Sequence, residues 1–336
     1  MRAVDTIDKG PRIGDATLGG RYTLLAQVKA STESTKQYIG QKGPCRYCGE
    51  RDARFFRTEA QAFPEGLGNQ WVVSRDECDK CNRLFSKYDD AIVRAVGPFL
   101  TLGGVKGKSN KVRQTGRSDG PAVLSRRNGA DRPELSIRSI DTERSQQMAV
   151  TSEGALRLNF PVADDPFRPR YAYKALVKMA IALLPDAEIA NYGRLRTWLL
   201  DSDDAIEFPH LDVGISFASI GHAPELLIGA LLRRRDPEEL VPHILFVFSA
   251  GSVCFQIDVM SDHLEDHLPP LPAGTINIEW TNTVGSPNRP EAISFRYGRP
   301  TYFNWSSAQS QPQPVKEIVL EFNPRTNNGS LIPIFR

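Results

Sequence analysis

The chain has 336 residues, of which 40% are hydrophobic and 24% are charged, an ordinary composition for a globular chain long enough to form two domains. The formal net charge is only +2, which excludes a general polycation, so any nucleic-acid surface must come from local clusters of Lys and Arg. The sequence contains no apolar run long enough to span a membrane, and its first residues lack the apolar core of a secretory signal. We therefore expect a cytoplasmic protein.

Residues 1–40 form an N-terminal segment with a weak pattern. Within it, residues 21–28 could form either a strand or a short helix, and the polar run that follows indicates no function. The next part of the chain, residues 41–115, contains four of the five cysteines and is predicted to be the first compact unit.

The cysteines of this unit form two pairs with the same internal spacing. Two residues separate the members of each pair and 29 residues separate the pairs, in the order Cys45, Cys48, Cys78 and Cys81. A two-residue gap lets both thiolates face one ion from a tight turn, and two such turns complete a tetrahedron of sulfurs. Because thiols stay reduced in the cytoplasm, the pattern predicts a structural Zn²⁺ site rather than disulfides or a redox pair. Cys254 lies far away, and we expect a small buried apolar residue there.

The residues between and after the pairs carry a second motif. Its elements are Pro64, the run Leu67-Gly68-Asn69, the run CDKCN at 78–82, and Asp90. This combination resembles the zinc-stabilised HNH endonucleases over about residues 42–108. In that family a histidine stands three residues before the proline. A Leu-Gly-Asn or Leu-Gly-Gly turn follows, and an acidic residue or histidine comes about eight positions after the CxxCN asparagine.

The resemblance implies a ββα-metal nuclease module, in which a hairpin and a helix hold one Mg²⁺ or Mn²⁺ ion at the scissile phosphate. By position, Asn82 is the middle residue of the catalytic trio, which orients the base or holds the loop between hairpin and helix. Asp90 is the metal ligand on the helix, because eight residues are about two helical turns. Glu59 is a candidate second ligand, and the neighbouring Asp89 is expected to be solvated.

The sequence departs from the family at the position of the general base. Gln61 stands where the family has histidine, and an amide cannot take a proton from water at neutral pH. Two interpretations follow: an active nuclease whose base has been replaced, or a relative that binds without cutting or cuts slowly. Because the rest of the motif is intact, we favour the first. All five histidines lie after residue 209, and the pair His263 and His267 is expected to lie in a solvated turn.

Lysines and arginines cluster just after the predicted nuclease helix. The cluster comprises Lys106, Lys108, Lys111 and Arg113, in a segment that also contains glycine and serine. Clustered cations bind phosphate backbones by releasing counterions, so the segment is predicted to be a DNA-contacting arm. The alternative is a solvated linker. Arg75, between the cysteine pairs, is a further candidate phosphate contact.

Residues 116–133 are predicted to be a basic, flexible linker, and residues 134–336 a second domain of α+β type with a mostly antiparallel sheet. Two strands are predicted over 134–140 and 155–162, and they could pair as a hairpin. Apolar steps of three and four predict a helix over 169–185, and Asp186 is expected to cap a second helix over 187–200. Later strands are predicted over 213–219, 226–233, 243–249, 253–259, 274–280, 292–297 and 315–322.

The leading functional hypothesis is therefore a metal-dependent DNA endonuclease, impaired at Gln61, followed by a sensing, oligomerising or partner-binding domain. By resemblance, bacterial proteins of this architecture often serve in defence against phage and are switched on by a ligand or a partner ATPase. The alternative is a non-catalytic zinc module that binds nucleic acid or docks a partner. A homo-oligomer or a structural subunit of a defence complex is compatible with the second domain.

Overall fold

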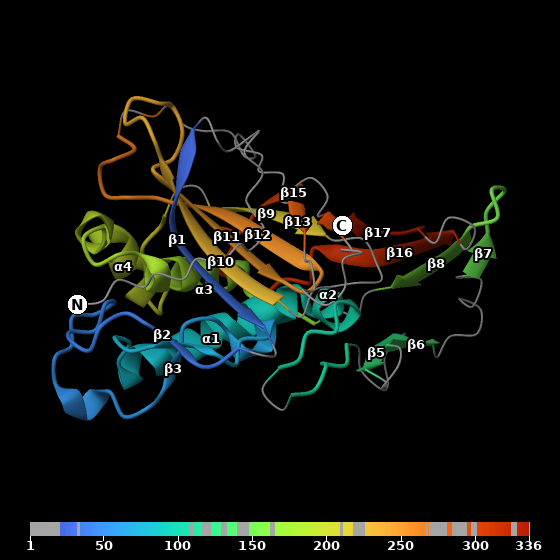
Figure 1. The fold of residues 1–336 in the computed structure, drawn as a ribbon, viewed down its shortest axis with the longest axis horizontal. Helices are drawn as coiled ribbons and strands as arrows, with labels where there is room; N and C mark the ends of the chain where they lie inside the picture. The colour runs from blue at the N-terminus through green and yellow to red at the C-terminus, as the bar shows by residue number, and fades with distance from the viewer. Residues whose placement is uncertain are drawn as a thin grey trace.

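A computed structural model describes residues 21–31, 34–107, 110–115, 122–128, 133–139, 148–161, 165–208, 211–217, 226–266, 268, 281–283, 294–296, 301–323 and 328–335. These residues form a mixed α+β structure with mostly antiparallel sheets and few helices, which confirms the predicted fold class at that level (Figure 1). Within the described ranges no helix combines the length and apolar character needed to cross a membrane.

The largest sheet has six strands, and all neighbouring strands are antiparallel. Their order is β1 (Tyr22–Ser31), β10 (Leu226–Arg234), β11 (Ile244–Ala250), β12 (Val253–Val259), β9 (Asp212–Phe217) and β15 (Thr301–Asn304). Every residue of β11 is buried, so both faces of this central strand are covered. A continuous apolar run without alternation is the sequence pattern of such a strand.

The edge strand β1 comes from the predicted N-terminal segment. It pairs with β10 from Tyr22 to Ser31, so residues 21–28 adopt the strand alternative rather than the helix. The Tyr22 hydroxyl also donates to Pro242 O at 2.8 Å, in the loop between β10 and β11 at the same end of the sheet. Residues 22–31 therefore contribute an edge strand to the large sheet.

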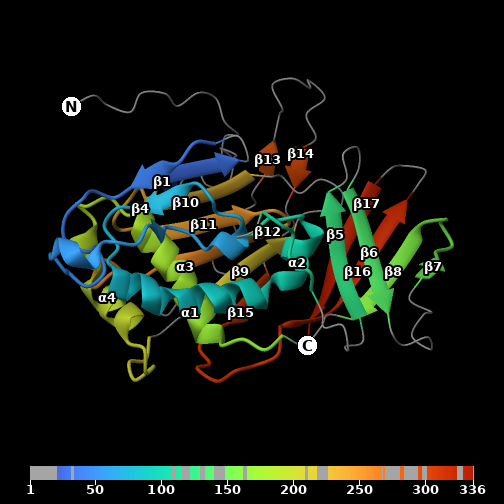
Figure 2. The ribbon, with the colours of Figure 1, turned by 90° about the horizontal axis from the view of Figure 1, so that it is seen from below.

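One long helix lies against this sheet, and a second long helix packs along the first. The predicted helix over 169–185 is confirmed as α3 (Pro169–Leu183), which packs on β10 and β12, and α1 (Asp79–Ala95) packs along α3 (Figures 1 and 2). A proline in the first turn suits α3, since that position needs no backbone donor. A short helix, α2 (Gly97–Leu102), continues from α1.

The second predicted helix is shorter than expected. A 3₁₀ turn, Ile189–Tyr192, precedes α4 (Gly193–Leu200). The expectation that Asp186 caps it is wrong, because that carboxylate instead pairs with Arg46 at 3.1 Å. The backbone amides of Gly193 and Arg194 donate to the carboxylate of Asp262, each at 2.9 Å. The cap therefore comes from a loop about seventy residues away.

A second antiparallel sheet lies at one end of the molecule (Figure 2). It contains, in order, β17 (Asn328–Phe335), β16 (Val315–Asn323), β8 (Leu156–Pro161) and β7 (Met148–Val150), and nearby β5 (Ala122–Asn128) pairs with β6 (Pro133–Ser139). The strands predicted at 134–140 and 155–162 exist but pair with different partners, so the hairpin is wrong. The predicted linker 116–133 contains β5. The strand predicted over 274–280 lies outside the described residues, and β13 (Thr281–Thr283) pairs with β14 (Ser294–Arg296).

The smallest sheet belongs to the part of the chain that carries the cysteines, residues 37–95, which we call the cysteine unit. Its strands lie in the order β2 (Gln37–Ile39), β4 (Val72–Ser74) and β3 (Ala60–Gln61), and α1 follows shortly after β4. Two 3₁₀ turns, η1 (Ala53–Phe55) and η2 (Glu65–Leu67), lie in its loops.

One aromatic side chain joins the cysteine unit to the large sheet. The ring of Phe63 lies 5.2 Å from that of Phe248 on β11. A Cβ at Gly229 on β10 would stand 2.8 Å from Phe63 Cζ, so only glycine lets the ring approach the strand this closely. The buried residues of both parts consequently form one continuous core.

Candidate metal centre and the hairpin beside it

The first cysteine pair lies in a tight turn that depends on glycine. Gly49 has φ +79°, a left-handed conformation that a residue with a Cβ rarely adopts. Its amide donates to Cys45 O at 2.8 Å, and the amide of Cys45 donates to Glu50 O at 2.7 Å. These two bonds fold residues 45–50 back on themselves, so that Cys45 and Cys48 face the same side.

The second pair lies at the start of α1. Cys78 is the extended residue before the helix, and Cys81 lies in its first turn. The carboxylate of Asp79 accepts the backbone amides of Thr58 at 2.9 Å and Arg57 at 3.2 Å, which holds the loop before β3 against the helix start. The rigid first turn of α1 thus fixes both the cysteine pair and the hairpin.

The four sulfurs gather into one cluster. All of them lie within 4.8 Å of one another, with 3.8 Å between Cys45 and Cys81 and 3.6 Å between Cys48 and Cys78. A Zn–S bond of about 2.3 Å gives sulfur separations of about 3.8 Å at tetrahedral angles. The donor set and its spacing can therefore hold a metal ion such as zinc. Cys48 is exposed and the other three are buried.

The four thiols influence one another's protonation. The hydrogen bond between the Cys45 and Cys81 sulfurs, helped by backbone amides around both pairs, lowers the pKa of Cys45 to about 5. Burial raises the pKa of Cys78 to about 11, and the hydrogen bond with Cys45 raises that of Cys81 well above its usual range. Cys45 therefore loses its proton easily, whereas loss of further protons from the cluster is unfavourable unless a divalent ion replaces them.

Asn69 holds the loop between β3 and β4. Its side chain is fully buried, and its amide nitrogen lies 3.0 Å from Gln61 Oε1 and 2.8 Å from both Phe63 O and Val72 O. Its oxygen accepts the amides of Trp71 at 3.2 Å and Val72 at 2.9 Å. This asparagine therefore both closes the loop and orients the side chain at position 61. It was visible in the Leu-Gly-Asn turn, but the sequence assigned it no role.

A buried lysine from α3 connects the hairpin to α1. Lys178 Nζ donates to Gln61 O at 2.6 Å and lies 3.7 Å from Asp89 Oδ2 and 4.0 Å from Glu77 Oε2. Burial raises the pKa of Glu77 to about 8 and that of Asp89 above its usual range. Both oxygens of Glu77 and Oδ1 of Asp89 have no hydrogen-bond partner within the described structure. Lys178 is thus the cation on which strand β3 and helix α1 converge.

The predicted catalytic acids have different neighbours. Asp90 is 57% exposed and pairs with Arg94 at 2.7 Å, one turn further along α1. Glu59 is 43% exposed and pairs with Lys36 at 2.6 Å. Asn82 is half-buried in the first turn of α1, where its amide donates to Cys78 O. The expectation that Asp89 is solvated is wrong, since it is the α1 carboxylate that faces the hairpin.

The predicted DNA-contacting arm is described in part, and Lys108 lies outside the described residues. Arg113 pairs with Asp165 at 2.8 Å, while Lys111 is exposed. Lys106 lies in a bridge with Val112. A Cβ at Gly68, which has φ +93°, would stand 2.9 Å from Val105, so this segment starts directly beside the hairpin loop. The arm is therefore anchored next to the cysteine unit.

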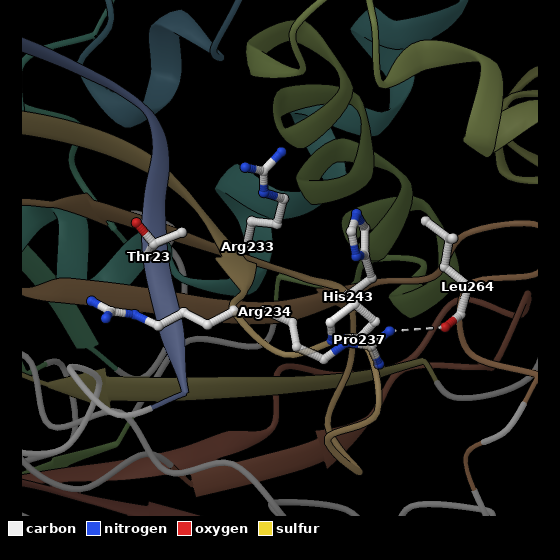
Figure 3. A pocket seen from close by; sticks show the side chains of 7 residues that line it. Thr23, Arg233, Arg234, Pro237, His243 and Leu264 are labelled. Atoms are coloured by element: carbon white, nitrogen blue, oxygen red, sulfur yellow. Dashed lines mark hydrogen bonds between the residues drawn. The ribbon is translucent and has the colours of Figure 1, made fainter.

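An arginine-lined pocket of about 590 Å³ lies at the end of β10, with Arg233, Arg234 and His243 in its wall (Figure 3). The Arg234 guanidinium donates to Val241 O at 2.8 Å and Leu264 O at 3.2 Å. Arg233 pairs with Glu188 at 3.2 Å, and burial lowers the pKa of His243. These contacts hold the loops around the strand end, so the arginines have a structural task here.

No family model, no curated protein and no solved structure matches the chain. Within the described residues, the four cysteines are the one group of three or more His, Cys, Asp and Glu side chains close enough to hold a metal ion.

Proposed function

We propose that the chain is a metal-dependent DNA endonuclease of the HNH kind, stabilised by zinc and impaired by the amide at position 61. The observation that carries the proposal is the convergence beside the sulfur cluster. The backbone carbonyl of Gln61 on the hairpin and the carboxylate of Asp89 on α1 both contact Lys178 Nζ, and this meeting of strand and helix supports the proposal. The order hairpin, cysteine pair, helix agrees with the resemblance that the sequence shows.

The surroundings of position 61 suit a histidine base. As a base, a neutral imidazole would donate its N–H to an acceptor and keep its lone-pair nitrogen to take a proton from water, and Asn69, whose side chain lies 3.0 Å from Gln61 Oε1, is near enough to orient such a ring. Lys178 binds the backbone carbonyl of Gln61, so the strand would keep its position after the side chain changes. The glutamine amide has no such acid–base chemistry.

The catalytic cation would be Mg²⁺ or Mn²⁺. Magnesium is commonly held by one or two carboxylates together with substrate phosphates, so a single carboxylate on α1 is sufficient. When bound, such an ion would polarise the scissile phosphate and stabilise the leaving oxygen. Asp90 is the proposed ligand, with Glu59 as the second candidate, and each would first have to leave its present ion pair.

The test is to restore the base. The Gln61→His protein, loaded with zinc, is incubated with supercoiled plasmid and Mg²⁺ or Mn²⁺, and the nicked and linear forms are followed with time. We expect a rate about 10²–10⁴ times that of the Gln61 protein. Gln61→Asn keeps an amide and serves as the matched control. Adding Asp90→Asn to Gln61→His should abolish the gain. A folded, zinc-loaded Gln61→His protein that leaves plasmid intact with either ion would overturn the proposal.

The second candidate is a zinc module that binds nucleic acid without cutting it. The amide at position 61 and the pairing of Asp90 with Arg94 favour it. It predicts DNA binding that weakens with salt and no turnover, whatever residue stands at 61. The plasmid assay and a binding isotherm on the same Gln61→His protein separate the two candidates.

We also propose a setting for this activity, on the resemblance alone. The protein would act in the cytoplasm in defence against foreign DNA. Residues 134–336 would respond to a ligand, a partner ATPase or a second copy of the chain. Plasmid cleavage by the Gln61→His protein that appears only when a candidate partner is added would support this role.

A further inference from the structure

A second pocket, of about 840 Å³, opens on the small sheet of the cysteine unit. Its wall includes Tyr38 on β2, Arg75 just after β4, Phe56 after η1, and Lys42 and Arg51 from the loops around the first cysteine pair. These residues come from strand β2, from the ends of β4 and η1, and from both sides of the first cysteine pair. The pocket is therefore a product of the folded cysteine unit rather than of one segment.

The pocket lies on the same face of the small sheet as position 61. Tyr38 is the register partner of Val73 on β4, and Val73 is the register partner of Gln61 on β3. Side chains of paired residues project from the same face of a sheet. Tyr38 and Val73 both line the pocket, so Gln61 projects toward the same side of the sheet.

The pocket carries positive charge. In the described part of the chain no carboxylate pairs with Lys42, Arg51 or Arg75, and all three are exposed. The two acidic residues of the wall already have cationic neighbours, since Glu59 pairs with Lys36 at 2.6 Å and Glu77 lies 4.0 Å from Lys178 Nζ. A site with three free cations and compensated acids attracts an anion.

The pocket also offers an aromatic platform. Tyr38 is 47% exposed, although it is a large apolar side chain, and the Arg75 guanidinium lies 4.4 Å from its ring centroid. An exposed ring beside a guanidinium is the combination on which bases of a single strand stack, with cations along the sugar-phosphate backbone. A free phosphate or an acidic peptide would use the cations but would leave the ring without a partner.

We propose that this pocket binds a nucleoside phosphate unit of a DNA strand, with the base on Tyr38 and the phosphates on Arg75, Lys42 and Arg51. The inference rests on the proposed function in that it names the strand-binding subsite of the same module. It is nevertheless a statement about binding, which needs neither a general base nor a catalytic cation. It can therefore fail or hold independently of cleavage.

The experiment measures binding of a fluorescent oligothymidylate of about twenty nucleotides to the full-length, zinc-loaded protein, without Mg²⁺ or Mn²⁺, by anisotropy. Tyr38→Ala should raise Kd about tenfold, whereas Tyr38→Phe keeps the ring and should bind like the parent. Arg75→Ala should raise Kd and lower the slope of log Kd against log salt by about 0.7, as one phosphate contact is lost. Unlabelled thymidine monophosphate should compete better than inorganic phosphate.

Arg168→Ala is the matched control, because Arg168 also stacks on a tyrosine, at 5.0 Å from the Tyr171 ring, but on α3 outside the pocket. It should leave Kd unchanged. All variants must retain zinc and the parental unfolding midpoint. Equal Kd values for the parent, Tyr38→Ala and Arg75→Ala would overturn the inference, as would displacement of the oligonucleotide by polyglutamate as effective as by DNA. If a Gln61→His protein bound the oligonucleotide in a Tyr38-dependent way but never cut plasmid DNA, only the nuclease proposal would be contradicted.

Discussion

The cysteine unit and the six-stranded sheet share one core but are held together differently. The seven residues of β11 are all buried, and six of them are apolar. The cysteine unit instead buries polar groups: the sulfur cluster, the Arg46–Asp76 ion pair, and Glu77 and Asp89 around Lys178. Apolar packing tolerates substitutions that conserve volume, whereas a buried polar group without its partner is costly. We therefore expect single polar changes to disrupt the cysteine unit as a whole.

The largest effect should follow from loss of the metal cluster. Cys45→Ala removes one of four ligands, and we expect the bound zinc to fall from one per chain to almost none, with loss of protected amides in α1. A structural zinc is worth on the order of 10 kcal/mol in small domains. Metal analysis and hydrogen exchange measure the two effects.

Cys254→Ala is the matched change in the sheet, where a buried cysteine on β12 has no part in the cluster. It should cost about 1–2 kcal/mol of unfolding free energy and leave the zinc in place. A Cys45→Ala protein that keeps one zinc and a protected α1 would contradict the metal centre.

The next largest effect concerns two buried lysines on one face of α3. Lys178→Met leaves Asp89 and Glu77 without their cation and should cost about 3–5 kcal/mol, with faster exchange in β3 and β4. Lys174 lies one turn earlier and donates to Asp201 O at 2.5 Å and to Asp204 Oδ1 at 3.0 Å. Lys174→Met should cost a similar amount but loosen the loop after α4 instead.

Urea unfolding and residue-level hydrogen exchange distinguish the two lysines. Adding Asp89→Asn to Lys178→Met should recover part of the loss, because one of the unpaired carboxylates is then neutral. If both Met variants loosened the same segment, the view that Lys178 specifically joins hairpin and helix would have to be abandoned.

The two regions also differ in how far the sequence predicts them. Spacing alone placed the four cysteines, and apolar periodicity gave α3 and the central strands, since both signals are local. Lys178 contacts Gln61, 117 residues away in the chain. No local sequence pattern predicts which distant polar group a lysine in an apolar helix will contact. The prediction that Asp89 is solvated failed for a simpler reason. Two helical turns take about 7.2 residues, so Asp89, seven residues after Asn82, lies nearer to the helix face of Asn82 than Asp90 does.

The smallest expected effect tests an exception within the sheet. Asp258 on β12 faces Asp212 and Glu265, and burial, followed by these two carboxylates, raises its pKa from 3.8 to about 7. Between these values the folded protein keeps a proton that the unfolded chain gives up. The contribution of Asp258 to the free energy of unfolding is therefore largest below about pH 4 and is lost as the pH rises through 7. Asp258→Asn should remove about 1–3 kcal/mol of this fall, measured by urea unfolding at several pH values. An unchanged slope for Asp258→Asn would mean that water hydrates the carboxylate in the folded protein, and the expected pH dependence would have to be abandoned.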